Sequence, residues 1–263
     1  MIPRTSTKQN SRYLFLVPVI TLLLFAGCRK GEEETTNCEK IANVRITTNA
    51  PLTIGQDLTL NVPEVEGYRI YSWRGPNNFT SQYPDNTISY AELKNEGWYY
   101  MNVYSLEGEC EKFDSVYVDV RLEQGTPACN ITTNNTSYSN MGTDAYTQVR
   151  KQIETTFSQK ALLATGAGAN MTIIFHTRWR TAEPEDGIYY TSNTPTFSQT
   201  DWNYNKVFIS TVKNSIYWAS HDNQKVYVSH VGGKLQVRFC NLAMSGSNGT
   251  SFTTSASGNL VEL

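Results

Sequence analysis

Few side chains in this sequence have the type and spacing that chemistry requires. The three histidines, His176, His221 and His230, are far apart along strand-like sequence, so we expect no shared metal site. The acidic run at residues 183–186, "EPED", offers paired carboxylates for acid and base work, but acidic residues around a proline are more typical of a solvated loop. Motifs for a catalytic nucleophile, a zinc-binding helix or a phosphate loop do not occur. We therefore expect no catalytic residue, no metal and no cofactor.

A polar segment with two aromatic residues is the candidate for ligand binding. In "TDWNYNK", residues 200–206, Trp202 and Tyr204 alternate with polar residues such as Asp201 and Asn203. Aromatic rings offer apolar contact to the face of a sugar, and amide and carboxylate groups can orient its hydroxyls. The competing interpretation is that both rings fold back and cover the open end of a β-structure. Burial statistics favour the second interpretation, because large aromatic side chains are mostly buried even when they come from loops.

Cys28 follows a sequence with the pattern of an export signal. Three basic residues precede the uncharged segment 13–27, which is shorter than the roughly 20 apolar residues of a spanning helix and ends in two small residues. The stretch "LLLFAGC" resembles a bacterial lipoprotein signal, in which the cysteine is diacylated and becomes the new N-terminus. The resemblance implies that residues 1–27 are removed and that Cys28 carries lipid. Plain secretion, with Cys28 as a spare thiol, is the alternative.

Residues 28–37 are polar and cannot form a core, so we expect a solvated tether. Three consecutive glutamates, residues 32–34, stand just behind Cys28. They resemble the acidic export tag of Bacteroidota-type lipoproteins. This resemblance implies lipid anchoring in the outer membrane with exposure on the cell surface, whereas a simple charged linker is the alternative.

Composition and length limit the class of protein. Without residues 1–27 the chain keeps 19 basic residues against 24 acidic ones, a net charge of −5. The basic residues are scattered, so we expect no nucleic-acid partner. Aromatic residues make up 12% of the chain and charged residues 17%, which is typical of extracellular β-structure. The length suggests two domains that meet at residues 121–129, "RLEQGTPAC", where a strand-like run gives way to turn-forming residues.

Five cysteines leave one thiol unpaired in an oxidising compartment, and a lipidated Cys28 accounts for it. The remaining four fall two on each side of the expected domain boundary. We therefore expect one disulfide between Cys38 and Cys110 and a second between Cys129 and Cys240.

Residues 38–121 consist of short alternating runs broken by turn residues, which predicts an all-β sandwich. The segments "YSWRGPNNFTS" and "NEGWYYMNVYSLEGEC" resemble the PKD-like or immunoglobulin-like modules of bacterial surface proteins. The resemblance implies that Trp73 is the core tryptophan and that Tyr99 is the corner tyrosine. Met101 stands where antibody domains have a cysteine. Such modules serve as spacers and binding units, so the resemblance implies no reaction.

Residues 129–263 are predicted to form a second β-rich domain. Apolar residues at steps of three and four predict a helix over residues 144–164, with Asp144 as its cap. Tight turns are expected at Lys213-Asn214 and Gly232-Gly233. We therefore expect an antiparallel β-sandwich or an open barrel that carries one helix.

These expectations combine into a non-enzymatic lipoprotein of the outer surface that acts as a binding or adhesion module for a glycan or a protein. The alternative is a lipoprotein hydrolase with an unrecognised site in residues 129–263. A cleft with clustered carboxylates of shifted pKa would favour the hydrolase. A shallow surface of aromatic side chains would favour the binding module.

Overall fold

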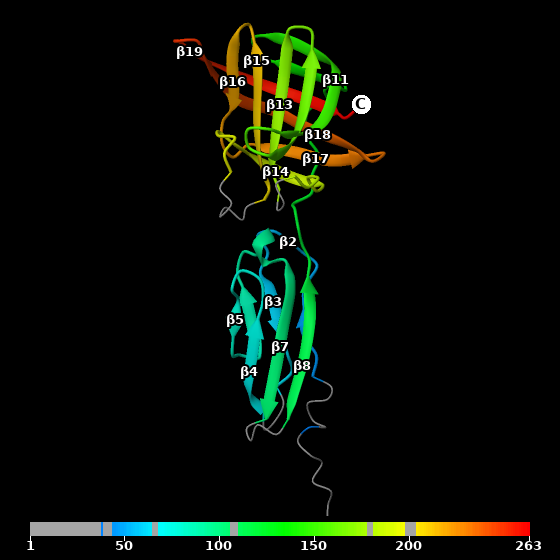
Figure 1. Cartoon of the computed structure of the whole chain (residues 1–263), viewed down its shortest axis with the longest axis vertical. Coiled ribbons are helices and arrows are strands. Elements are labelled where there is room, and N and C mark those ends of the chain that lie inside the picture. The colour runs from blue at the N-terminus through cyan, green and yellow to red at the C-terminus, as the bar shows by residue number, and fades with distance from the viewer. Residues whose placement is uncertain (1–37, 39–43, 65–67, 106–109, 178–180, 198–203) are drawn as a thin grey trace, which may run out of the picture. The chain divides into compact units, whose positions relative to one another are not determined.

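The structure is a computed structural model that describes residues 38, 44–64, 68–105, 110–177, 181–197 and 204–263. The signal sequence, the tether and Cys28 lie outside these residues. Apart from Cys38 and a single 3-10 turn, η1 (Leu93–Asn95), every regular element that the structure describes is a β-strand (Figure 1). No helix in the described part of the chain has the length and apolar character that crossing a membrane requires.

The first module, residues 44–121, contains three small sheets. One has the strand order β1-β3-β6, a second has the order β5-β4-β7-β8, and a third is the parallel pair β2-β9. The strands are β1 (Thr47–Thr48), β2 (Leu52–Thr53), β3 (Leu58–Asn61), β4 (Tyr68–Arg74), β5 (Thr80–Ser81), β6 (Asp85–Ile88), β7 (Gly97–Ser105), β8 (Glu111–Val118) and β9 (Val120–Arg121).

The core of the first module has the features of an immunoglobulin-like sandwich. Trp73 is 2% exposed, and its indole Nε1 donates a hydrogen bond to the Tyr83 carbonyl at 2.9 Å. Tyr99 is fully buried, and its hydroxyl donates to the Asn95 carbonyl at 3.0 Å. This bond from a β7 tyrosine back to the preceding turn is the tyrosine corner that the sequence predicts. Met101 fills the core at the position of the absent cysteine.

We expect Tyr99→Phe to lower the free energy of unfolding at pH 7 by about 1 kcal/mol, because the substitution removes the buried hydrogen bond from the hydroxyl to the Asn95 carbonyl. Burial raises the pKa of Tyr99 to about 12, although its hydrogen bond with Asn95 opposes this shift. The stability that comes from the neutral hydroxyl is therefore complete below pH 10 and is lost as the pH rises towards 12. Urea unfolding at pH 7 and pH 11 tests both effects: the variant should lose less stability than the wild type between these pH values. An equal loss in both proteins would contradict the assignment.

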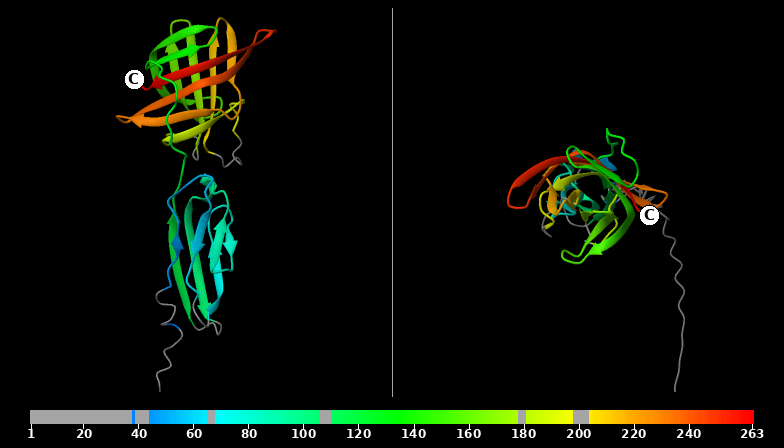
Figure 2. Two further views of the ribbon diagram at one scale, coloured as in Figure 1. Left: turned by 180° about the vertical axis from the view of Figure 1, so that it is seen from behind. Right: turned by 90° about the horizontal axis from the view of Figure 1, so that it is seen from above.

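The second module is one sheet of ten strands in the order β13-β12-β11-β10-β19-β18-β16-β15-β14-β17. Further pairings of β13 with β15 and of β17 with β18 close it on itself, and Figure 2 shows the strands curving around a common interior. One pair, β14 with β15, is parallel. The strands are β10 (Asn135–Tyr138), β11 (Gly142–Glu154), β12 (Gln159–Gly166), β13 (Ala169–His176), β14 (Gly187–Ser192), β15 (Lys206–Lys213), β16 (Ile216–Ser220), β17 (Lys225–Val231), β18 (Lys234–Ser247) and β19 (Ser251–Val261). The expected antiparallel β-sandwich or open barrel is therefore confirmed as β-structure with mainly antiparallel pairing, but the sheet contains one parallel pair and closes on itself.

The helix predicted over residues 144–164 is also wrong, because this segment forms the hairpin of β11 and β12. A β-bulge shifts the register of β11 against β12 between Tyr146 and Gln148, so that one extra residue separates two side chains that point inwards. As a result, the buried residues Tyr146 and Val149 are three positions apart, which imitates the step of a helix. Ile153, which extends the same pattern, is 42% exposed.

Both predicted tight turns occur. Gly232 and Gly233 join β17 to β18 with φ values of +60° and +79°, the left-handed region that glycine tolerates. The other turn consists of Asn214 and Ser215, one residue later than expected, with φ values of +52° and +59°. Such turns match the twist of the strands that they join.

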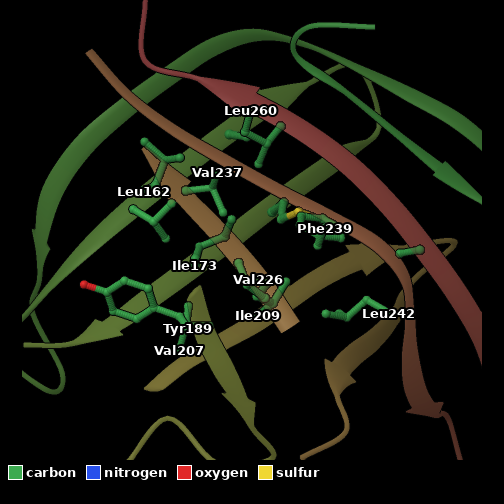
Figure 3. Close-up of a cluster of buried hydrophobic side chains, with 14 of the residues drawn as sticks. Leu162, Ile173, Tyr189, Val207, Ile209, Val226, Val237, Phe239, Leu242 and Leu260 are labelled. Carbon is green, nitrogen blue, oxygen red and sulfur yellow. The ribbon is translucent and has the colours of Figure 1, made fainter. Parts of the chain in front are cut away.

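Apolar side chains from the inner faces of these strands fill the interior of the second module (Figure 3). The chain enters this core before its first strand, because Leu122 is buried among the same side chains. Next to it, the Glu123 carbonyl accepts a hydrogen bond from the Ile188 backbone amide at 2.7 Å. The predicted joint therefore begins as a segment that packs on β14.

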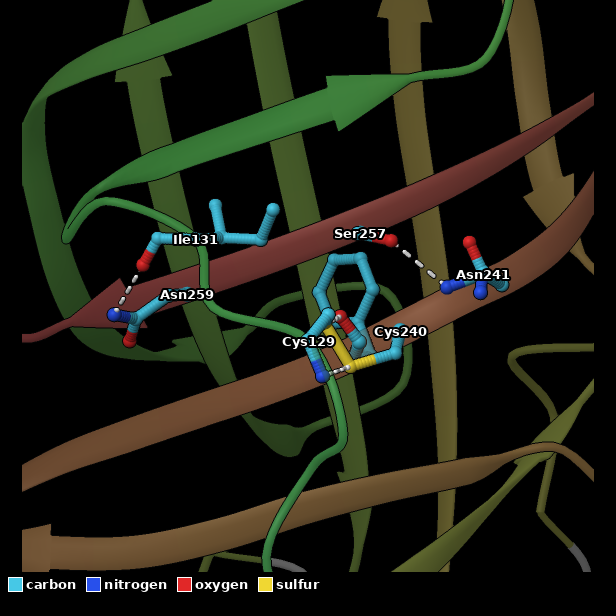
Figure 4. The surroundings of a disulfide bond; sticks show 7 residues. Cys129, Ile131, Cys240, Asn241, Ser257 and Asn259 are labelled. Carbon is cyan, nitrogen blue, oxygen red and sulfur yellow. Dashed lines mark hydrogen bonds between the residues drawn. A yellow bond between two sulfur atoms is a disulfide. The ribbon is translucent and has the colours of Figure 1, made fainter.

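Two disulfide bonds join Cys38 to Cys110 and Cys129 to Cys240, the pairs that the cysteine positions indicate. Cys240 lies in a β-bulge of β18, where the register against β19 shifts between Phe239 and Leu242. At this bulge the Asn241 backbone amide donates to Ser257 Oγ at 2.8 Å (Figure 4). The second disulfide thus ties the chain ahead of β10 to an irregular point of the sheet.

Candidate ligand-binding face

Of the four residues predicted to bind a ligand, the structure describes Tyr204. Its side chain is 9% exposed and lies near the ring of His176, with the two ring centres 5.4 Å apart. Phe197 stacks on the same histidine at 4.8 Å. Tyr204 therefore belongs to a buried aromatic cluster, and its ring does not offer an open surface to a sugar. The other three residues lie outside the described part of the chain: Asp201, Trp202 and Asn203.

The acidic run at residues 183–186 is held by ion pairs. Glu183 contacts the amino groups of Lys151 at 2.8 Å and Lys160 at 3.0 Å, and Asp186 lies 2.6 Å from Nδ1 of His230. Burial opposes the ionisation of Glu183, but hydrogen bonds from the two lysines outweigh it and lower its pKa. A carboxylate that is kept ionised by lysines is a poor general acid, so this network is suited to holding the loop.

Two further carboxylates near the second module also have lowered pKa values. The hydrogen bond from Lys225 lowers the pKa of Glu123, and, against the opposing effect of burial, backbone hydrogen bonds lower the pKa of Glu154. Within the described residues no cluster of three or more His, Cys, Asp or Glu side chains has the geometry to hold a metal ion.

One sheet of the first module exposes a row of aromatic side chains. Along β7, Tyr99, Met101 and Val103 point into the core, and the residues between them point to the opposite side because side chains alternate along a strand. The strand register places Tyr117 of β8 opposite Trp98, and Arg74 of β4 opposite Tyr100. We call this surface the aromatic face, and it consists of Arg74, Trp98, Tyr100, Asn102, Tyr104, Phe113 and Tyr117.

The rings of the aromatic face are exposed and support one another. Trp98 is 52% exposed, Phe113 50% and Tyr117 44%. Trp98 and Tyr117 meet edge to face with their centres 5.6 Å apart, and Tyr100 stacks on Phe113 at 5.9 Å. Large apolar side chains gathered at one exposed place mark interaction sites more often than single exposed ones do. Because the rings already hold each other in position, a ligand would have little side-chain freedom left to restrict.

Polar groups stand at the edges of these rings. The Tyr117 hydroxyl donates to the Glu96 carboxylate at 2.6 Å, and Asn102 donates from its amide to the Tyr104 hydroxyl at 3.0 Å. The Arg74 guanidinium lies over the Tyr100 ring, 5.0 Å from its centre. The face therefore combines flat apolar surfaces with hydrogen-bonding groups, the combination that sequence reasoning sought in residues 200–206.

A shallow depression is hollowed into the aromatic face. It is lined by Arg74, Glu96, Gly97, Trp98, Tyr100 and Tyr117, together with the turn that follows β4. Gly97 has a φ of +135°, and a Cβ atom at this position would lie 2.9 Å from Cγ of Pro76. Glycine thus allows the start of β7 to approach the turn closely, which shapes one wall of the depression.

This face was not among the predicted sites, although the sequence carries a signal for it. The segment "GWYYMNVYS" has aromatic residues in both of its alternating sets, and only one set can enter the core. Identifying Tyr99 as the corner tyrosine fixes which set is buried. Trp98, Tyr100 and Tyr104 must then face outwards.

Comparisons with known proteins leave the function open. No protein-family description and no curated protein matches the chain. Solved structures do match, among them the crystal structure of murine CEACAM1b, at 13% sequence identity over 84% of this chain and 98% of that chain. The TM-score of this match is 0.25, and a likeness at that level assigns neither a ligand nor an activity to the chain.

Proposed function

We propose that this protein is a lipid-anchored, non-catalytic binding protein of the bacterial outer surface and that the aromatic face binds carbohydrate. The observation that carries the proposal is the group of half-exposed rings at Trp98, Phe113 and Tyr117, with amide, hydroxyl and guanidinium groups at their edges. The CH-bearing face of a sugar packs on such rings, and its hydroxyls bond to the groups around them. The lowered pKa of Glu183 makes this carboxylate a poor general acid for glycoside hydrolysis, which needs a carboxylic acid that stays protonated.

The anchor in this proposal is a diacylated Cys28, supported by the two small residues before it and by the odd number of cysteines. Mass spectrometry of the mature N-terminus tests it. We expect an N-terminal peptide that begins at Cys28 and carries the mass of the acyl chains. A mature chain with an unmodified Cys28 contradicts the anchor.

We expect Trp98→Ala to weaken carbohydrate binding by about 30-fold, which corresponds to the roughly 2 kcal/mol of an aromatic residue at the centre of an interface. The fold should be preserved, since the side chain is half exposed. A glycan array identifies a ligand for the mature chain, and titration calorimetry then compares the two proteins.

Tyr217→Ala is the matched control, because Tyr217 is also an aromatic residue, is 52% exposed and belongs to β16 of the second module. It should bind the ligand as the wild type does. Equal binding by Trp98→Ala and the wild type, or the absence of any glycan ligand, contradicts the proposed function.

A further inference from the structure

We propose that the aromatic face selects acidic carbohydrate and that Arg74 pairs with a carboxylate on a sugar ring. This inference rests on the proposed function and adds the chemical class of the ligand. Three features carry it: the placement of Arg74, the lack of an ion pair that would occupy it in the described residues, and the flat rings that border the same depression.

Arg74 is held on the aromatic face without an acidic side chain in contact with it among the described residues. It is exposed, it lies opposite Tyr100 in the strand register, and its guanidinium is placed over the Tyr100 ring at 5.0 Å. In the described residues its side chain takes part in no ion pair and no hydrogen bond. A guanidinium presents its N–H groups along one edge, and this edge matches the two oxygens of a carboxylate.

Glu96 is the acid that lines the same depression, and it is already engaged. Its carboxylate accepts the hydrogen bond from the Tyr117 hydroxyl at 2.6 Å and forms no ion pair with Arg74. Asp114, on the neighbouring β8, is also occupied, because it accepts a hydrogen bond from the Ile46 backbone amide at 2.8 Å. The positive charge of Arg74 is therefore available to a ligand.

The rings around Arg74 favour a sugar over an acidic peptide as the source of the carboxylate. Trp98 and Tyr117 line the depression together with Arg74, so a ligand that reaches the guanidinium also passes over aromatic surface. A pyranose ring is rigid and presents a flat CH face beside its carboxylate. Acidic side chains of a peptide are flexible and offer no such face, so they would use the charge and leave the rings uncovered.

The experiment compares oligogalacturonate with its methyl ester, which has the same backbone without the charge. Arg74→Gln in the mature chain should weaken oligogalacturonate binding by about 10- to 100-fold, the range expected for a charged hydrogen-bonded pair. Binding of the methyl ester should be weak in the wild type and unchanged in the variant. Arg74→Lys should restore only part of the affinity, because it keeps the charge without the planar N–H edge. An unchanged melting temperature of Arg74→Gln separates a binding role from a structural one.

Three other binding results would contradict this inference. Equal affinity of the wild type for the acid and for the ester, with Trp98→Ala weakening both, overturns the selection of acidic sugar and leaves the proposed function in place. Binding of sulfated dextran that depends on Arg74, without binding of oligogalacturonate, overturns the choice of a carboxylate. Binding of poly-glutamate in place of any carbohydrate overturns both this inference and the proposed function.

Discussion

Replacing Cys129 and Cys240 together by serine is expected to lower the free energy of unfolding of the second module by about 4–5 kcal/mol. The disulfide closes a loop with a sequence separation of 111 residues, and in the chain-entropy description the stabilisation grows with the size of the closed loop. A loss of this size is a large part of the total stability of a typical domain. Scanning calorimetry of the mature chain should therefore show one transition shifted to a much lower temperature.

The pair Cys38→Ser/Cys110→Ser is the matched control, because its loop has a sequence separation of 72 residues and lies in the first module. It should shift the other transition by a similar but smaller amount. If both variants lower the same transition and leave the other unchanged, the two modules do not unfold separately and the prediction is wrong.

Lys213→Met is expected to destabilise the second module by about 3–5 kcal/mol, because it leaves a buried carboxylate without its partner. The Lys213 amino group lies 2.5 Å from Oδ1 of Asp144, and the two side chains are 10% and 12% exposed. The same amino group is placed over the Tyr138 ring at 4.8 Å. Among the described residues, Oδ2 of Asp144 has no hydrogen-bond partner that would compensate for the loss of the lysine.

A second variant isolates the pair. Lys213→Met combined with Asp144→Asn removes both charges, so it should recover more than half of the lost stability in urea unfolding. Asp144→Asn alone measures the cost of an unpaired ammonium group. If the double variant is as unstable as the sum of the two single variants, the charges do not stabilise each other.

The first module could be predicted in detail because its key residues act locally. Trp73 fixes a core position, and Gly97 and Tyr99 fix a turn and a hydrogen bond to the residues just before it; the structure places Trp73 and Tyr99 as expected. The cysteine pairs followed from the odd count and from the position of the expected domain boundary. These features depend on residue type and near neighbours, which a sequence displays directly.

The second module could be predicted only in outline because its errors come from long-range pairing. The bulge at Tyr146 spaces the buried residues as a helix would, and only the partner strand β12 shows that the segment is extended. The closure of β13 on β15 joins residues from Asn170–His176 to residues from Lys206–Val212, and no local pattern announces it. No local sequence pattern predicts the parallel pairing of β14 with β15 either.

Sequence reasoning missed the aromatic face for a related reason. Aromatic residues in a polar segment were the stronger local signal, so Trp202 and Tyr204 were selected, but the structure buries Tyr204 beside His176. The aromatic face is assembled from three strands, and its composition becomes visible when Arg74, Tyr100 and their neighbours are aligned across the sheet. The aromatic face is therefore defined by the register between strands, which the sequence alone does not reveal.

Closure of the large sheet also affects how the second module resists aggregation. Among the described residues, every strand of the second module pairs with at least two other strands, so no strand of this sheet is an edge along its whole length. An open edge is a template on which other chains can add strands and aggregate. In the first module, the four-stranded sheet ends at β8, which borders the aromatic face. The half-exposed Phe113 and Tyr117 lie on this edge strand, so the proposed binding face is also a place where unwanted strand addition must be resisted.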